Sequence, residues 1–218
     1  MAMSTRRDEL ELNLRSVEAE VSPFNPTLIV VTKTYPVSDV EILRSLGAEN
    51  FGENRSDEGL AKSASVNARW HYQGEIQSKK IKEIVGWADC IHSLDTLAHA
   101  EKIARAEVSK PIEVFLQLSL DGDPERGGVR ESELFELAEA VSIMPTISLL
   151  GIMSVPPVSM DVASAFAAIS KVHQRFIAEF PGSPYLSAGM SGDYMIALNH
   201  GATHIRVGSK ILGARQYH

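Results

Sequence analysis

The sequence has little that would staple a small fold or anchor it in a membrane. Its single cysteine, Cys90, excludes an internal disulfide and a Cys-x-x-Cys zinc pair. The longest apolar runs, such as residues 28–31, are far too short to cross a bilayer. The N-terminus is polar, with acidic residues soon after two arginines, and does not resemble a signal peptide. We therefore expect a cytoplasmic protein of a reducing compartment with no membrane partner.

Positive charge is also scarce, because 21 Lys and Arg residues face 28 Asp and Glu residues, giving a formal net charge of −7. A broad nucleic-acid surface needs a basic face, so we expect no nucleic-acid partner. A small anionic ligand needs only a local site and stays compatible with this balance. No long exposed apolar helix is evident, and we expect a monomer.

Short apolar runs alternate with longer amphipathic segments along the whole chain. Strands are predicted at 27–32, 48–51, 69–72, 90–92, 112–118, 147–152, 185–188 and 203–207. Helices are predicted at 5–21, 37–46, 53–67, 78–85, 96–108, 131–142, 161–180 and 191–200. Ser191 is the expected N-cap of the last of these helices, and Gly201 its left-handed stop.

Repeated strand–helix units favour parallel strands, and eight of them favour an α/β fold of the (β/α)8 TIM-barrel type. We expect one domain over residues 1–218, with an extra N-terminal helix before the first strand. A doubly wound open sheet is the competing fold. In a barrel, functional groups gather at the carboxyl ends of the strands.

Lys33 follows the most apolar predicted strand, T-L-I-V-V-T, and would lie in the barrel mouth. Partial desolvation lowers the pKa of an amine and makes it nucleophilic, which favours a Schiff-base lysine. The alternative is a lysine whose stem packs at a strand end while its ammonium reaches water. Most of the other lysines fall on predicted helices or loops, where a solvated ammonium is expected.

Two small-residue turns mark the ends of the seventh and eighth strands, at Gly189–Gly192 and at Val207–Ser209. Barrels often hold phosphate between these two loops, where glycines let the backbone approach a ligand. Ser191 adds a hydroxyl. The sequence therefore indicates a phosphate site, with ordinary turn residues as the alternative. Met153 ends the sixth strand and would either line the pocket or pack in the core.

Five stretches together resemble a known family. They are V-T-K-T-Y-P, F-G-E-N, W-H-Y-Q-G-E-I-Q-S-K-K, G-I-M-S-V-P-P, and L-S-A-G-M-S-G-D-Y through R-V-G-S-K-I-L-G-A-R-Q-Y. The chain resembles the pyridoxal 5′-phosphate (PLP) homeostasis proteins, also called proline synthase co-transcribed proteins, over almost its whole length. Lys79 stands where that family usually has Asn, which changes the rim after the third strand but not the Schiff base.

The resemblance implies a barrel like the N-terminal domain of alanine racemase, with PLP as cofactor. It implies a Schiff base on Lys33, Asn54 near the cofactor, and Arg206 at its ring nitrogen. It places four residues at the phosphate: Met190, Ser191, Gly208 and Ser209. From the residues alone, Arg206 is either a rim salt bridge or an inward guanidinium, whose charge would oppose protonation of a ring nitrogen.

Family members are thought to buffer or deliver PLP, so we expect a carrier without efficient catalysis and without catalytic residues. Apoenzymes that use PLP are the expected recipients. The alternative is a PLP-dependent amino-acid racemase or lyase. The chain ends soon after the eighth strand, where racemases have a further domain, and Tyr35 and Tyr72 are internal candidates for the second proton-transferring group. A phosphosugar enzyme would need Glu53 as its base.

We expect no metal site. His200 and His204 are separated by Gly201 and do not share a helical face. An acidic loop at 121–128 lacks most of a calcium-binding loop. Cys90 and Trp70 are expected to pack in the core, and the role of His71 stays open.

Overall fold

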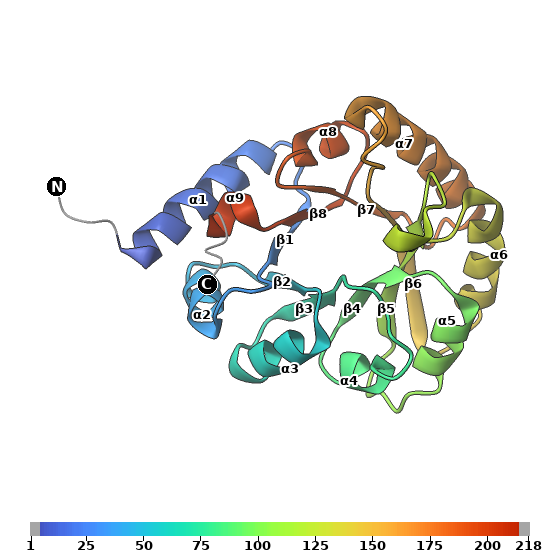
Figure 1. Ribbon diagram of the computed structural model, residues 1–218, viewed down its shortest axis with the longest axis horizontal. Coiled ribbons are helices and arrows are strands. Elements are labelled where there is room, and N and C mark those ends of the chain that lie inside the picture. Colours follow the sequence, from blue (N-terminus) through green and yellow to red (C-terminus); the bar gives the residue numbers. More distant parts are fainter. Residues whose placement is uncertain (1–4, 214–218) are drawn as a thin grey trace.

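The computed structural model describes residues 5–213 and shows eight parallel strands closed into a barrel, each strand paired with the next and β8 paired with β1. The helices surround the strands on the outside (Figure 1). The closed order confirms the barrel and excludes the open sheet. The strands are β1 (Thr27–Val31), β2 (Asn50–Glu53), β3 (Arg69–Tyr72), β4 (Cys90–Leu94), β5 (Ile112–Leu118), β6 (Ile147–Ser154), β7 (Tyr185–Met190) and β8 (His204–Val207).

The helices follow the predicted rhythm, with short additions. They are α1 (Arg6–Val21), α2 (Val37–Ser45), α3 (Ser56–Ser65), α4 (Ile81–Val85), α5 (Leu97–Ala104), the 3₁₀ turn η1 (Pro124–Arg126), α6 (Glu131–Ser142), α7 (Val162–Glu179), α8 (Tyr194–Asn199) and α9 (Ser209–Leu212). Within residues 5–213, none of these helices has the length and apolar character to cross a membrane.

Several helix and strand boundaries differ from the predictions, mainly near the carboxyl ends of the strands. Strand β2 runs on to Glu53, so the helix predicted from residue 53 begins only at Ser56. Ser191 is not the N-cap of α8; Asp193 precedes that helix instead and accepts a hydrogen bond from the Met190 N–H at 2.6 Å. Helix α9 was not predicted, because four residues are too few to show a period. Gly201 has φ +92°, as its role as a helix stop requires.

The core has two parts. The larger part is apolar and lies between the strands and the surrounding helices. Trp70 belongs to it, with its ring centroid 5.5 Å from that of Phe51, which confirms the packing role. Cys90, Phe115 and Met153 form a smaller cluster of their own. Cys90 is fully buried and unbridged, as expected of a core cysteine.

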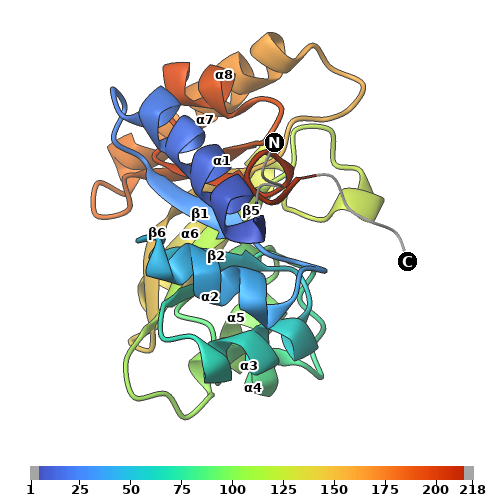
Figure 2. The ribbon, with the colours of Figure 1, turned by 90° about the vertical axis from the view of Figure 1, so that its left-hand side faces the viewer.

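Helix α1 covers the outside of the barrel next to α2 and α9 (Figures 1 and 2). It begins with a capping box between Thr5 and Asp8. Arg6 donates to the Asp39 carboxylate at 2.7 Å and to the Leu212 carbonyl oxygen at 3.0 Å. The first helix thus ties α2 to α9. The last four residues of the final sequence motif, Ala214–Tyr217, lie outside the described residues, as do residues 1–4.

Candidate functional site

A cavity of about 320 Å³ opens at the carboxyl ends of the strands, within the size range of small-molecule sites. All eight residues predicted for the site line it, namely Lys33, Asn54, Met153, Met190, Ser191, Arg206, Gly208 and Ser209. Gly192, from the predicted phosphate turn, and Tyr35, a candidate proton-transferring group, line it as well. Three further lining residues were not predicted from the sequence, namely Val31, Gln73 and Val155. Groups from β1, β2, β6, β7 and β8 therefore converge on one space.

Lys33 is half-buried, two residues beyond the end of β1, and both of its chain neighbours are fixed by hydrogen bonds. Thr32 donates from Oγ1 to the Glu53 carboxylate at 2.6 Å. The Thr34 N–H donates to the Glu58 carboxylate at 2.7 Å, and Thr34 adopts φ +71°. The turn that carries Lys33 is thus held from both sides by acidic residues.

A buried ion pair supports the same turn. Lys62, on α3, lies 2.6 Å from Glu53 and also donates to the Thr32 carbonyl oxygen at 2.7 Å. Both side chains are essentially excluded from solvent, so the expectation of a solvated ammonium is wrong for Lys62. Burial raises the pKa of the Glu53 carboxyl, and Lys62 opposes that rise. Glu53 does not line the cavity, which removes it as a rim base.

Asn54 and Gln73 carry polar atoms that have not found partners. Asn54 Oδ1 and Gln73 Nε2 are buried and lack a hydrogen-bond partner among residues 5–213. Because such groups are costly to leave unpaired, they are natural contacts for a polar ligand. Gly74 lets the chain approach this corner, since a Cβ there would overlap the Asn54 carbonyl oxygen.

The two predicted phosphate turns are joined to each other. Ser191 Oγ accepts hydrogen bonds from the N–H groups of Gly208, at 3.1 Å, and Lys210, at 3.4 Å. Ser209 and Gly192 are exposed on the same side, and a Cβ at Gly192 would meet nothing within 4 Å. This corner combines hydroxyl groups with backbone that a ligand can approach closely, as an anion site requires.

Arg206 points into the barrel and is 5% exposed, so the rim salt bridge is wrong. Its guanidinium contacts two neutral oxygens, donating to Ser187 Oγ at 2.8 Å and to the Ser154 carbonyl oxygen at 3.4 Å. Burial lowers the pKa of Arg206 to about 10, which leaves the group charged at neutral pH. Arg206 therefore supplies a fixed positive charge to the cavity.

The two tyrosines considered as proton-transferring groups differ in placement. Tyr35 lines the cavity, and its hydroxyl donates to the Gly213 carbonyl oxygen at 2.8 Å. Tyr72 is not among the lining residues and donates to the Glu75 carbonyl oxygen at 2.8 Å. Burial raises the pKa of Tyr72 to about 12, which makes it a poorer acid.

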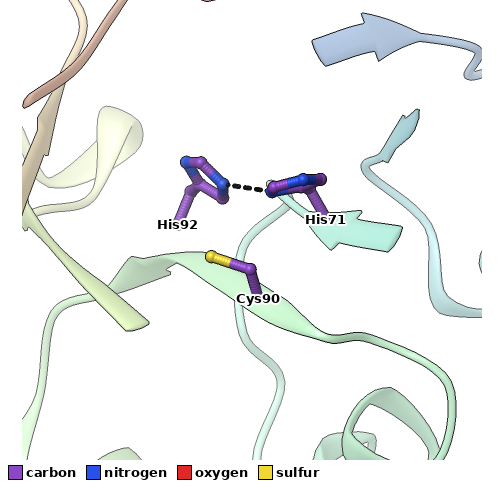
Figure 3. Close-up of side chains that lie close together, drawn as sticks. All are labelled: His71, Cys90 and His92. Carbon is purple, nitrogen blue, oxygen red and sulfur yellow. Dashed lines mark hydrogen bonds between the residues drawn. The ribbon is translucent and has the colours of Figure 1, made fainter. Parts of the chain in front are cut away.

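His71, Cys90 and His92 form a second polar group, whose ligand atoms lie within 4.8 Å of one another. The sequence left His71 open and did not single out His92. Figure 3 shows the two imidazole rings joined by a hydrogen bond between their edges, with Cys90 nearby. His71 Nδ1 and His92 Nε2 are 2.8 Å apart, so each of these nitrogens already takes part in a hydrogen bond with the other ring.

Comparison with known proteins identifies the family of the chain. A model of the family described as "Alanine racemase, N-terminal domain" matches residues 6–216. The pyridoxal phosphate homeostasis protein of Corynebacterium glutamicum is 39% identical over 198 residues, covering 86% of this chain and 90% of the relative. The protein of the same name from Vibrio alginolyticus is 35% identical over 208 residues, covering 90% and 89%.

Solved structures share the fold. PipY of Synechococcus elongatus, in a structure with PLP bound, has a TM-score of 0.85 and 29% identity, and the match covers 94% of this chain and all of PipY. Alanine racemase from Corynebacterium glutamicum has a TM-score of 0.76 at 16% identity, which shows the fold alone. This chain spans 62% of that racemase.

Proposed function

Because this chain belongs to the pyridoxal phosphate homeostasis proteins, within the alanine racemase N-terminal domain family, we propose that it holds PLP as a Schiff base on Lys33 and takes part in vitamin B6 homeostasis. The observation that carries the proposal is the convergence of an amine, a buried guanidinium and an anion corner on one cavity. PLP supplies an aldehyde that condenses with amines, a ring nitrogen and a phosphate.

The residues present fit this group. Lys33 would offer the amine, the buried Arg206 guanidinium would contact the ring nitrogen, and the corner at Ser191 and Ser209 would offer donors to the phosphate. Two buried polar atoms without partners, Asn54 Oδ1 and Gln73 Nε2, leave room for contacts with the ring substituents. Met153 adds apolar surface to the cavity lining.

The arrangement favours holding and delivering PLP over efficient catalysis. The charge of Arg206 disfavours a protonated ring nitrogen, and that weakens the electron withdrawal on which carbanion chemistry depends. Racemisation also needs a proton-transferring group on each face of the substrate. Tyr35 hydrogen-bonds to backbone, and Tyr72 is outside the cavity lining.

The direct test is absorbance of the purified protein with PLP, followed by borohydride reduction and peptide mapping. We expect a yellow adduct and a single reduced label on Lys33. A label on another lysine, or no adduct at stoichiometric PLP, would show that the proposal is wrong.

Catalysis is tested separately. We expect the PLP-loaded protein to convert D-alanine to L-alanine no faster than free PLP does, because the Tyr35 hydroxyl is bonded to the Gly213 carbonyl oxygen and Tyr72 lies outside the cavity lining. A chiral chromatography assay measures this. Robust turnover that disappears in Lys33→Ala protein would favour the racemase alternative.

We further propose that the protein acts as a cytoplasmic monomer that passes PLP to apoenzymes. The half-exposed mouth, bordered by exposed Met190 and Ser209, suits release of the cofactor. Light scattering of the loaded protein would check its mass. Transfer of label from loaded protein to an apo aminotransferase, faster than from an equal concentration of free PLP, would support delivery.

Gly74→Ala is expected to weaken PLP binding about fivefold, the worth of about one hydrogen bond, because the new Cβ displaces the Asn54 backbone. Titration followed by the adduct absorbance measures the change. Gly182→Ala is the matched control, because a Cβ there meets nothing within 4 Å. Equal affinities in the two variants would remove Asn54 from the site.

A further inference from the structure

A row of polar side chains continues from the cavity into the barrel, where such folds usually pack branched apolar residues. Arg206 Nη1 lies 2.8 Å from Ser187 Oγ, which lies 2.8 Å from His92 Nδ1. His92 Nε2 lies 2.8 Å from His71 Nδ1 (Figure 3), and His71 Nε2 lies 3.0 Å from Asn50 Oδ1. Five strands contribute one residue each.

The positions of the hydrogens along this row follow from its far end. An amide oxygen only accepts, so His71 Nε2 carries the hydrogen that it shares with Asn50. Burial lowers the pKa of both histidines well below 6.5, so each ring is neutral and carries one hydrogen. His71 Nδ1 therefore accepts from His92 Nε2–H, and His92 Nδ1 accepts from the Ser187 hydroxyl. Ser187 Oγ is then left to accept from Arg206.

A metal site is the competing interpretation, since His71, Cys90 and His92 offer three ligand atoms close together. Burial raises the pKa of the Cys90 thiol well above its usual value, whereas a metal binds the thiolate. A metal would also displace the hydrogen bond between the two rings. The hydrogen-bonded row is therefore the interpretation that the contacts favour.

We propose that Ser187, His92, His71 and Asn50 form one hydrogen-bonded chain, donating in a fixed direction, that holds the Arg206 guanidinium at the floor of the cavity. These four are positioning residues for the ring of the bound cofactor, an assignment that rests on the proposed PLP function. Each member accepts the hydrogen bond that its neighbour donates, so loss of one leaves the next partner unsatisfied. The oxygens that accept from Arg206 are thus the neutral Ser187 hydroxyl and the Ser154 carbonyl, so its hydrogen bonds leave its charge directed toward the ligand.

The hydrogen positions are tested without PLP, by ¹⁵N NMR of imidazole nitrogens at pH 7. His71→Gln and His92→Gln proteins assign the signals. We expect both rings to be neutral, with hydrogen on Nε2 and none on Nδ1. A hydrogen on Nδ1 of either ring, or a charged ring, would overturn the chain. So would one equivalent of zinc retained by the purified protein and lost in Cys90→Ser.

The positioning role is tested with Ser187→Ala. We expect about fivefold weaker PLP binding, the worth of one neutral hydrogen bond, and a shifted absorbance maximum of the adduct, because Arg206 and His92 both lose a partner. Ser187→Thr, which keeps the hydroxyl, should restore both. Ser183→Ala removes another buried hydroxyl, which donates to the Leu149 carbonyl oxygen at 2.7 Å, and should lower stability without moving the spectrum.

The outcomes separate the two proposals. If the wild-type protein forms no adduct with PLP, the proposed function fails, while the NMR result still decides whether the chain exists. If the adduct forms and Ser187→Ala matches the wild type in affinity and absorbance, the positioning role fails. If Ser183→Ala shifts the spectrum as much as Ser187→Ala does, the effect is a general loss of packing, and the role also fails.

Discussion

Replacement of Lys33 by Ala is expected to abolish the covalent PLP adduct and leave only weak binding through the phosphate corner. Without an amine, borohydride has no adduct to reduce, so no label appears on the protein. We expect the affinity for PLP to fall roughly 100-fold, which corresponds to ~2.7 kcal/mol. Absorbance titration and mass spectrometry of the reduced protein measure the two effects.

Lys79→Ala is the matched control for this variant. Lys79 is exposed and does not line the cavity, so its loss changes the same charge at the surface. The adduct should form as in the wild type. An adduct that survives in Lys33→Ala but disappears in Lys79→Ala would show that the Schiff base forms on Lys79 and not on Lys33.

Replacement of Lys62 by Met is expected to cost about 3–5 kcal/mol of unfolding free energy, because it leaves the Glu53 carboxylate buried without its cation. In a domain of this size that lowers the melting temperature by roughly 10 °C. Calorimetry measures the change. The PLP affinity should fall as well, since Lys62 also fixes the Thr32 carbonyl beside Lys33.

The loss should depend on pH with a defined sign. The folded pKa of Glu53 is raised above its usual value near 4.5, so the folded state binds more protons there than the unfolded state. Stability contributed by this carboxyl is therefore present at low pH and lost as pH rises through the folded pKa. Removing Lys62 raises that pKa further, so the loss of unfolding free energy relative to the wild type should grow as the pH rises above about 4.5.

A double variant isolates the charge. Glu53→Gln combined with Lys62→Met removes both members of the pair, and should recover most of the stability that Lys62→Met loses. If the double variant is as unstable as the single one, packing rather than an uncompensated carboxylate explains the loss.

Much of the site could be predicted because its residues sit where strands end. Lys33, Arg206 and Ser209 follow or end predicted strands, and a barrel brings such ends to one rim. Asn54 and Met190 were predicted as site residues from the motifs shared with the PLP homeostasis proteins. Gln73 and Val155 were missed although each directly follows a strand, because neither an amide nor a small apolar residue announces chemistry by itself.

The polar interior was harder to foresee, although a signal was present. Buried parallel strands usually read as continuous apolar runs. Here polar and apolar residues alternate, with His71 beside Trp70 and His92 beside Ile91. That alternation would place the histidines inward and their apolar neighbours toward the helices. Which nitrogen faces which ring depends on strand register, and single-sequence patterns do not fix it.

Lys62 shows a different limit. Its helix was predicted, but its spacing alone looked like that of a solvated face. Burial followed from the extension of β2 to Glu53, which places a carboxylate outside the barrel and under α3. An error of two residues in the predicted end of this strand was therefore enough to conceal an ion pair.

The cavity spans the junction between β1 and β8, the one neighbouring pair in the barrel that no strand–helix unit connects. Lys33 lies on the β1 side of this junction, and Gly208 and Ser209 lie on the β8 side. A cofactor that is bonded after the first strand and bound by residues after the last strand would link the N-terminal and C-terminal parts of the barrel. PLP binding should then slow amide hydrogen exchange in α1 and α9. These helices cover the same junction from outside, and Arg6 joins them through its hydrogen bond to the Leu212 carbonyl oxygen.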